Sequence, residues 1–197
     1  ARPVDLPADH GNLRRLDLCH QPTRTGRQSI RRALQYPCAG GTRPQVTLLA
    51  HATCIALRSR GRSSVRTWRA ALLRGPSGAG KSDLALRLIE AGARLVADDQ
   101  TRIVRKGRVL FAAAPIAIAG LIEVRGIGIM KLARSQWASR APLSLLVDLV
   151  PADRIERLPE LAEEAVLGVN LPVLALAPFE ISAVAKLQLA LAQISTA

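Results

Sequence analysis

The feature that most constrains the fold is a glycine-rich octapeptide at residues 75–82, which reads Gly-Pro-Ser-Gly-Ala-Gly-Lys-Ser. It matches a loop pattern in which backbone N–H groups surround a phosphate chain, the lysine contacts the outer phosphates and the hydroxyl holds Mg²⁺. The last two roles fall to Lys81 and Ser82. The implied ligand is a nucleoside triphosphate such as ATP, and the implied binding residues are Gly75, Pro76, Ser77, Gly78, Ala79, Gly80, Lys81 and Ser82.

The residues on either side of this glycine-rich loop supply the context that the pattern requires. Residues 70–74 (AALLR) form a short apolar run typical of a buried strand. From Ser82 onward the sequence predicts a helix, with Asp83 in its first turn and Gly92 as its C-cap. The apolar stripe of this helix comprises Leu84, Ala85, Leu88 and Ile89. The order strand, loop, helix argues against the alternative of a flexible surface loop.

The composition favours an α/β fold. Apolar residues make up 49% of the chain but aromatic residues only 3%, so Ala, Leu, Val and Ile have to build the core. This composition suits a mostly parallel sheet that helices cover. The 197 residues suffice for one such core. We therefore expect a mixed sheet that contains the phosphate-binding loop, with flanking helices, in a single catalytic domain over residues 46–197.

The pattern of apolar and turn residues predicts the remaining elements. We expect strands at residues 46–57, 94–97, 143–149 and 171–176, a hairpin over 101–111 that turns at Lys106-Gly107, and a short strand entering a glycine-containing loop at 123–129. Helices are expected through residues 157–164 and over 179–193. The strand at 46–57 is expected to pair with the strand at 70–74.

The charge is concentrated in the first part of the chain. The formal net charge is +13, but residues 1–74 hold 14 Arg against 3 Asp, whereas residues 75–197 hold 14 Lys and Arg against 12 acidic residues. Residues 1–45 are rich in Arg, Pro, Gly, Gln and Thr without apolar periodicity, so we expect them to be disordered. Their arginines are consistent with a solvated tail, an arm for nucleic acid or membrane surfaces, or a targeting segment. Nucleic-acid binding is not expected of the catalytic domain.

Two adjacent acids follow the predicted strand at 94–97. Asp98 and Asp99 lie at its C-terminal end, on the edge of the sheet where the glycine-rich loop also lies and where α/β proteins bind ligands. Neighbouring side chains at a strand end point in opposite directions. One aspartate is therefore expected to face the outer phosphate, while the other holds a metal-bound water or caps a turn. An ordinary acidic turn is the alternative.

Further candidates for the site follow the longest apolar run, Val109–Ile122. Glu123 is either a surface group at a strand end or a metal ligand brought alongside Ser82. Arg125, next to Gly126 and Gly128, could meet a phosphate through a close backbone approach.

Three other residues have an ordinary structural interpretation when taken singly. His51 in an apolar strand is more often a hydrogen-bonded core histidine than a catalytic group. Arg157 suits a solvated helix face, and Cys54 suits a core position.

The sequence gives no sign of a membrane span or a disulfide framework. The apolar run of 14 residues at 109–122 contains Pro115 and is too short to span a membrane. Three widely spaced cysteines without a Cys-x-x-Cys pair suggest a reducing compartment, and no secretory signal is visible. We therefore expect a cytoplasmic protein.

Together these residues resemble the catalytic domain of the HPr kinase/phosphorylase family, from about Thr47 to the end of the chain. The similarity is closest to the short form of alphaproteobacteria, which lacks an N-terminal domain. The matching segments are HATCIAL at 51–57, GPSGAGKSDLALRLIEAGARLVADD at 75–99 and LIEVRGIGI at 121–129. Members of the family phosphorylate a serine of the phosphocarrier protein HPr with ATP, in regulation of the phosphotransferase system and carbon metabolism.

The resemblance assigns roles to residues of this chain. It implies that Lys81 and the glycine-rich loop bind ATP, that Ser82 and Glu123 hold Mg²⁺, and that Asp99 is the base that takes the serine proton. His51 becomes an active-site residue, and residues 123–131 correspond to the family's signature loop. Arg157 matches an active-site arginine that neutralises phosphate. The family resemblance also implies a homo-oligomer, a hexamer.

One family segment departs in this chain. The Pro-Val-x-x-Gly-Arg-Asn segment, linked to dephosphorylation in the family, reads here LPVLALAP at 171–178, without Gly-Arg-Asn. The resemblance therefore does not carry the phosphorylase activity over to this chain. Two alternatives to a protein kinase stay open: a regulatory module that senses ATP without using it, and a small-molecule kinase, which the absence of an obvious lid with paired arginines argues against.

Overall fold

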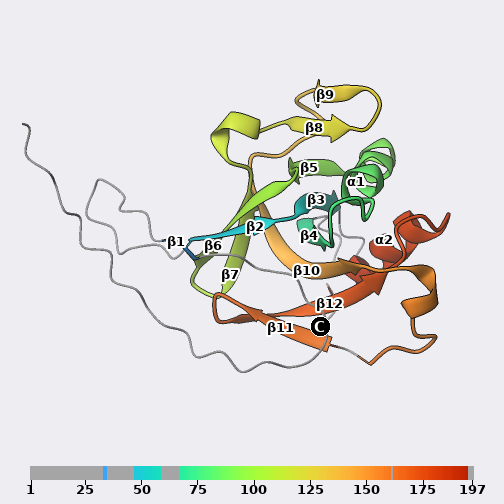
Figure 1. Cartoon of the computed structure of the whole chain (residues 1–197). Coiled ribbons are helices and arrows are strands. Elements are labelled where there is room, and N and C mark those ends of the chain that lie inside the picture. The colour runs from blue at the N-terminus through green and yellow to red at the C-terminus, as the bar shows by residue number, and fades with distance from the viewer. Residues whose placement is uncertain (1–32, 35–46, 59–66, 161, 195–197) are drawn as a thin grey trace, which may run out of the picture.

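The computed structural model describes residues 33–34, 47–58, 67–160 and 162–194 (Figure 1). Its strands are β1 Ala33–Leu34, β2 Thr47–His51, β3 Thr53–Arg58, β4 Trp68–Arg74, β5 Arg94–Ala97, β6 Gln100–Lys106, β7 Val109–Ala113, β8 Leu121–Val124, β9 Gly128–Lys131, β10 Ala141–Leu149, β11 Ala162–Val166 and β12 Val169–Leu176. Its helices are α1 Lys81–Glu90 and α2 Ala183–Ile194, with short 3₁₀ turns η1 Ile116–Ile118 and η2 Ala152–Arg154.

Four strands place their carboxyl ends at one edge of the main sheet. β10 is parallel to both β4 and β12. β3 lies between β4 and β5 and is antiparallel to both, so β5 runs in the same direction as β4. The order across this part of the sheet is β5-β3-β4-β10-β12. The glycine-rich loop follows β4 and the acid pair follows β5, so both leave the same edge, as predicted from the sequence.

The sheet is mixed, as predicted, but the expectation that it is mostly parallel is wrong. Within the described ranges, the extended pairings other than those of β10 with β4 and β12 are antiparallel. The chain joins neighbours through tight turns, such as the one between β6 and β7, whereas a parallel pair needs a long crossover. The alanine and leucine content reflects strands buried on both faces, which does not require that they be parallel.

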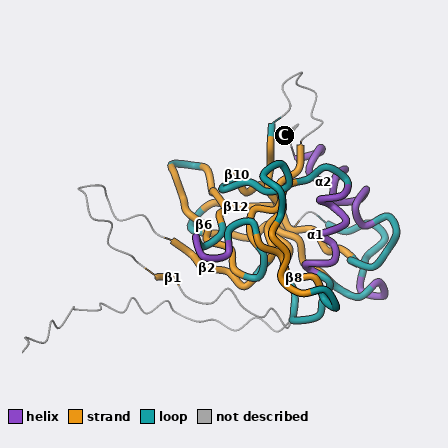
Figure 2. Tube along the Cα trace, turned by 90° about the horizontal axis from the view of Figure 1, so that it is seen from above, coloured by secondary structure: helices purple, strands orange, loops and turns teal. Residues whose placement is uncertain are grey.

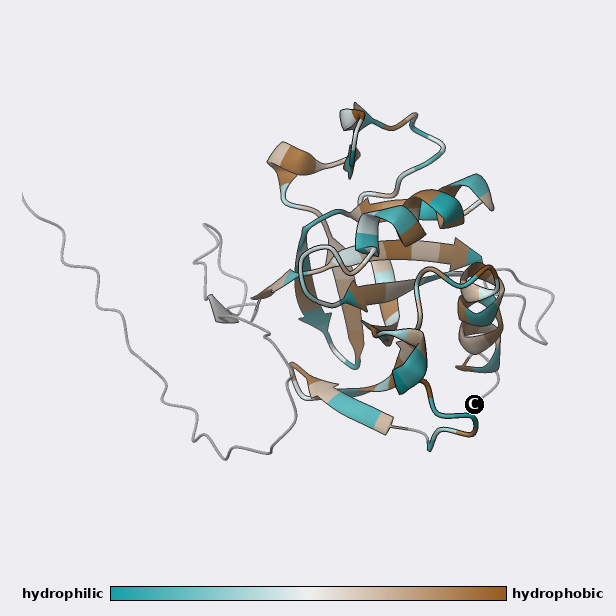
Figure 3. Ribbon diagram, turned by 45° about the vertical axis from the view of Figure 1, so that its right-hand side comes forward, coloured by the Kyte–Doolittle hydropathy of each residue, from teal (hydrophilic) through white to brown (hydrophobic). Residues whose placement is uncertain are grey.

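Both faces of β4 are buried because two different layers cover them. Ala71 and Leu73 belong to a cluster that includes Leu84 and Leu88 of α1 and Leu187 of α2. The alternate residues Ala70 and Leu72 belong to a second cluster, with residues of β2, β6 and β7 such as Leu48, Ile103 and Leu110. Helices therefore cover one face (Figure 2), and the curled continuation of the sheet covers the other. Figure 3 shows the apolar residues concentrated on these central strands.

The predicted strand at 46–57 is two strands, separated at Ala52. β2 pairs with β6, whereas β3 pairs with β4 and β5, so the chain changes partners at this point. The Ala52 N–H donates to the Asp99 carbonyl over 3.0 Å, and the Ala52 carbonyl accepts a 2.8 Å hydrogen bond from Thr101 Oγ1. The predicted pairing with the strand at 70–74 is correct for the second half. Residues 46–57 read as one continuous apolar segment, so the sequence did not predict the break at Ala52.

The predicted helix through residues 157–164 is wrong. Arg157 lies in an exposed loop, and Glu164 lies in β11, which pairs with β12 in an antiparallel hairpin. Arg74 of β4 donates to Glu164 Oε1 and to Asp148 Oδ1, each over 2.8 Å. Burial alone would lower the pKa of Arg74, but these two hydrogen bonds outweigh it and raise the pKa. Pairing with β12 and the contact with Arg74 thus override the helical preference of the Ala- and Glu-rich sequence.

Other predicted elements agree with the structure more closely. The strands at 94–97, 143–149 and 171–176 and the hairpin that turns at Lys106-Gly107 are confirmed as β5, β10, β12 and β6–β7. The segment at 123–129 belongs to a separate hairpin, β8–β9, which lies beside α1 (Figure 1). α2 begins at Ala183 rather than Phe179, because residues 179–182 form turns.

Two arginine-rich segments fall largely outside the described residues. Of residues 1–45, which we predict to be disordered, the structure describes β1, which pairs with β2. The arginine-rich connection between β3 and β4 is described up to Arg58 and from Thr67 onward. The apolar run at 109–122 forms β7, η1 and the start of β8. Among the helices in the described ranges, none has the length and apolar character that crossing a membrane requires.

Candidate active site

A cavity of about 370 Å³ lies at the sheet edge where the glycine-rich loop and the acid pair emerge. Residues far apart in sequence come together here, from the loop, α1, the end of β2, the β5–β6 turn, the β8–β9 hairpin and the segment after β12. Its lining consists of His51, Ser77, Gly78, Gly80, Lys81, Ser82, Asp83, Leu86, Asp99, Glu123, Val124, Arg125 and Phe179.

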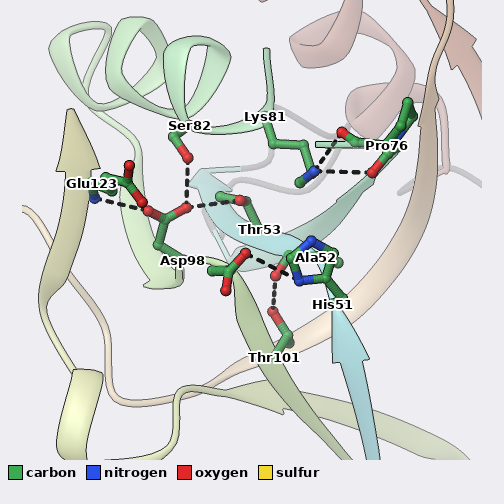
Figure 4. Close-up of polar contacts among 11 residues, drawn as sticks. His51, Ala52, Thr53, Pro76, Lys81, Ser82, Asp98, Thr101 and Glu123 are labelled. Atoms are coloured by element: carbon green, nitrogen blue, oxygen red, sulfur yellow. Dashed lines mark hydrogen bonds and ion pairs between the residues drawn. The ribbon is translucent and has the colours of Figure 1, made fainter. Parts of the chain in front are cut away.

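Lys81 is the buried cation of this cavity. Its Nζ donates to the carbonyl oxygens of Gly75 and Pro76, each over 2.9 Å, so the ammonium closes the loop on itself (Figure 4). Burial lowers the pKa of Lys81, and the nearby carboxylates of Asp99 and Asp98 act in the opposite direction. A lysine held only by two neutral carbonyls can exchange these for phosphate oxygens, which form stronger, charge-assisted hydrogen bonds.

The turn before α1 needs glycine at position 80. Gly80 has φ +81°, a left-handed conformation that costs other residues roughly 1–2 kcal/mol. A Cβ at this position would also lie 2.9 Å from Cζ of Phe179. The loop can therefore pass closely beneath the Phe179 ring only because residue 80 has no side chain.

Asp98 connects three parts of the site through its buried carboxylate. Its Oδ1 accepts hydrogen bonds from Thr53 Oγ1 over 2.8 Å and from Ser82 Oγ over 2.9 Å. Its Oδ2 accepts from the backbone N–H of Glu123 over 2.9 Å. Figure 4 shows Thr53, Ser82 and Glu123 arranged around Asp98. Asp98 therefore joins β3, the start of α1 and β8, and it places Glu123 alongside Ser82.

Asp99 turns the other way, as its position next to Asp98 predicts. Its carboxylate lines the cavity and is 62% exposed, and its Oδ1 lies 3.1 Å from Nδ1 of His51. The backbone of Asp99 has φ +60°, a conformation that Asp and Asn tolerate better than most residues. His51 is 55% exposed at the end of β2, so the interpretation as a core histidine is wrong. Asp99 is the freely accessible carboxylate of the acid pair.

The oxygen ligands at Ser82 and Glu123 suit Mg²⁺. Both side chains line the cavity, and Mg²⁺ in nucleotide sites is usually held by one or two carboxylates, substrate phosphates and water. Within the described ranges, no group of three or more His, Cys, Asp or Glu side chains could hold a metal without such help. The donor set therefore fits a magnesium ion that arrives with a triphosphate.

Some predicted site residues do not line the cavity. Gly75, Pro76 and Ala79 form the part of the loop behind Lys81, and Gly126 and Gly128 shape the turn of the β8–β9 hairpin with φ +84° and +118°. Arg125 does line the cavity, whereas Arg157 lies in the loop after η2 and is not among the lining residues.

Several residues at the site were not predicted as site residues from the sequence. Thr53 holds Asp98, Asp83 and Leu86 line the cavity from α1, Val124 lines it from β8, and Phe179 lines it from the segment after β12. Phe179 gave one usable signal, since it is one of two phenylalanines in the chain and follows a predicted strand. Cys54, predicted as a core residue, is fully buried, and this burial raises the pKa of its thiol.

Comparisons with known proteins match this chain to one family. Residues 69–187, more than half of the chain, match the model of the HPr serine kinase C-terminal domain family. Among relatives named HPr kinase/phosphorylase, the protein of Exiguobacterium sp. is 43% identical over 83 residues, which cover 40% of this chain and 27% of that protein. The protein of Lactobacillus acidophilus is 35% identical over 116 residues, which cover 52% of this chain and 36% of that protein. The chain thus spans only about a quarter to a third of the length of these relatives.

The fold agrees with a solved structure. The Hpr(Ser) kinase/phosphatase of Coxiella burnetii matches 74% of this chain and 92% of its own, with a TM-score of 0.58 and 23% sequence identity. At 23% identity this match supports the fold alone, whereas the match of residues 69–187 to the family model shows the family. This chain belongs to the HPr serine kinase C-terminal domain family.

Proposed function

We propose that this chain is an ATP- and Mg²⁺-dependent protein kinase that phosphorylates a serine of an HPr-like phosphocarrier protein. One observation carries the proposal: Lys81, Asp99 and Glu123, from three separate elements, line a single cavity at the sheet edge. Family membership supports HPr as the substrate protein. The proposal includes a role in phosphotransferase-system regulation and a cytoplasmic homo-oligomer, which the family resemblance implies.

Each residue has a specific task in the proposed reaction. The glycine-rich loop and Lys81 hold the phosphate chain of ATP and neutralise its charge. Asp99 orients the serine hydroxyl and accepts its proton while the serine oxygen bonds to the γ-phosphorus and the bond from this phosphorus to the β–γ bridging oxygen breaks, which releases ADP. His51, 3.1 Å from Asp99, holds that carboxylate in position. When bound at Ser82 and Glu123, Mg²⁺ supplies charge neutralisation to the β- and γ-phosphates.

Asp98 has a supporting task in this scheme. The Asp98 carboxylate is buried and accepts hydrogen bonds from Thr53, Ser82 and Glu123, so its oxygens are not available to accept the serine proton. It therefore positions the Ser82 hydroxyl and the Glu123 strand, while the accessible Asp99 performs the proton transfer.

Incubation with purified HPr, Mg²⁺ and γ-labelled ATP tests this function. We expect label on a serine of HPr, identified by mass spectrometry as acid-stable phosphoserine, and none on an HPr variant whose serines are replaced by alanine. The label should depend on added Mg²⁺. If HPr stays unlabelled while the chain still binds ATP, the kinase proposal is wrong and the ATP-sensing alternative gains support.

A further inference from the structure

An exposed aromatic ring beside the glycine-rich loop has no part in the phosphate chemistry described above. Phe179 lines the cavity and is 70% exposed, although aromatic residues make up only 3% of the chain. The side chains that surround the phosphate and metal positions, such as Lys81, Ser82 and Glu123, are polar. A large apolar ring left open to a polar cavity indicates a ligand with an apolar, planar part.

The strand order places Phe179 on the opposite side of the loop from the acids. Along the edge the order is β5-β3-β4-β10-β12, so the segments after β5 and β12 flank the loop that follows β4. Asp99 follows β5, and Phe179 follows β12. A triphosphate whose outer phosphate points at Asp99 must therefore have its nucleoside end on the side of Phe179.

Contacts with the loop and α1 hold Phe179 in this position. Its ring lies over Gly80, where an added Cβ would approach Cζ to 2.9 Å. Arg87 of α1 donates to the carbonyl of Pro178 and, over 2.9 Å, to Asp83 Oδ2. Pro178 is itself buried. The residue before the ring is thus anchored to the helix that begins with Lys81, which fixes the ring relative to the phosphate-binding part of the cavity.

We propose that Phe179 is the platform on which the nucleobase of the triphosphate stacks. The inference rests on the proposed function, since it assigns the other end of the same ligand. Stacking on an aromatic ring contributes roughly 1–3 kcal/mol per base. It acts on the base alone, because the proposed function assigns the phosphate chain to the glycine-rich loop and Lys81. Phe179 therefore determines the preference for a nucleoside triphosphate over the bare phosphate chain.

Binding measurements with ATP and with inorganic tripolyphosphate, both with Mg²⁺, separate the two ends of the site. We expect Phe179→Ala to weaken ATP binding about 5- to 150-fold, the range that corresponds to this stacking energy, and to leave tripolyphosphate binding unchanged. Phe179→Tyr should bind ATP like the original chain, because the aromatic face is kept. Phe179→Leu, which keeps apolar bulk without the ring, should behave like the alanine variant.

Ile181 provides the matched control. It is fully exposed in the same turn, two residues further on, and is not among the residues that line the cavity. Ile181→Ala removes a similar exposed apolar side chain and should leave the affinity for ATP unchanged. A general effect of surface hydrophobicity would instead change both variants alike.

The outcomes distinguish this inference from the proposed function. If Phe179→Ala binds ATP as tightly as the original chain, or loses ATP and tripolyphosphate equally, Phe179 does not bind the base. An unchanged chain that binds tripolyphosphate as tightly as ATP would also overturn the base site, while leaving the phosphate site intact. If the unchanged chain binds neither ligand, the proposed function fails and this inference fails with it.

Discussion

Replacing Lys81 with alanine is expected to lower the rate of phosphoryl transfer to HPr by about a thousandfold, the range seen when a cation that stabilises the transferring phosphoryl group is removed. Lys81 is buried, and it is the lysine among the residues that line the cavity. In the structure its Nζ contacts only the carbonyls of Gly75 and Pro76, which alanine leaves without their donor. A steady-state assay of labelled HPr, with circular dichroism to confirm folding, measures this effect.

Lys81→Arg is the matched variant for this prediction. It keeps the positive charge but replaces a compact ammonium by a planar guanidinium. The ammonium is enclosed between two loop carbonyls, so we expect the arginine variant to lose most of the transfer as well. Full activity in either folded variant would show that the lysine does not act on the phosphate.

Replacing Asp99 with asparagine is expected to slow transfer by about a hundred- to ten-thousandfold, the usual contribution of a general base, while ATP binding is retained. Asparagine has nearly the same shape and also tolerates the backbone φ of +60° at this position. It cannot accept the serine proton. Single-turnover rates with HPr, together with a direct measurement of ATP affinity, separate the chemical step from binding.

Asp98→Asn is the control for the Asp99 variant. The Asp98 carboxylate is buried and its Oδ2 accepts from the Glu123 N–H, which an amide NH₂ group at that position would oppose. Hydrogen bonds to a charged group contribute about 1.5–3 kcal/mol. Asp98→Asn should therefore lower the free energy of unfolding. Asp99→Asn should not, because its carboxylate is 62% exposed. If Asp99→Asn transferred phosphate at the original rate, Asp99 would not be the base.

These two aspartates also separate the kinase from an ATP sensor. A sensor needs ATP to bind but has no use for a base, so Asp99→Asn would leave its behaviour unchanged. In a kinase the same substitution removes transfer and spares binding. The exposed carboxylate of Asp99 in the cavity favours the kinase, since a group that only fixes the structure would be enclosed, as Asp98 is.

The central part of the site could be predicted from the sequence because local rules determine it. The glycine-rich loop must follow a strand and open a helix, and side chains that succeed each other at a strand end must diverge. These rules predicted a helix from Ser82, one residue after the Lys81 start of α1, and they gave Asp98 and Asp99 opposite directions. Glu123 was left open between a surface group and a metal ligand, and the Asp98 hydrogen bond to its N–H brings it to the cavity.

The rest depends on contacts between distant parts of the chain. Residues 162–166 have a composition that favours a helix, but pairing with β12 and the contact of Glu164 with Arg74 make them a strand. His51 is exposed because the chain changes strand partners at Ala52. The pattern of apolar residues along the chain does not indicate this change. Phe179 reaches the cavity only because β12 lies beyond β10 in the sheet. Pattern analysis along one segment cannot supply these pairings.

The most direct test is a crystal structure of the chain with Mg²⁺ and a non-hydrolysable ATP analogue. The account predicts that Lys81 Nζ leaves the carbonyls of Gly75 and Pro76 for oxygens of the phosphate chain, with the γ-phosphate between the loop and Asp99 and with Ser82 and Glu123 at the metal. A phosphate chain bound elsewhere, or bound with Asp99 and Glu123 turned away from it, would contradict the account.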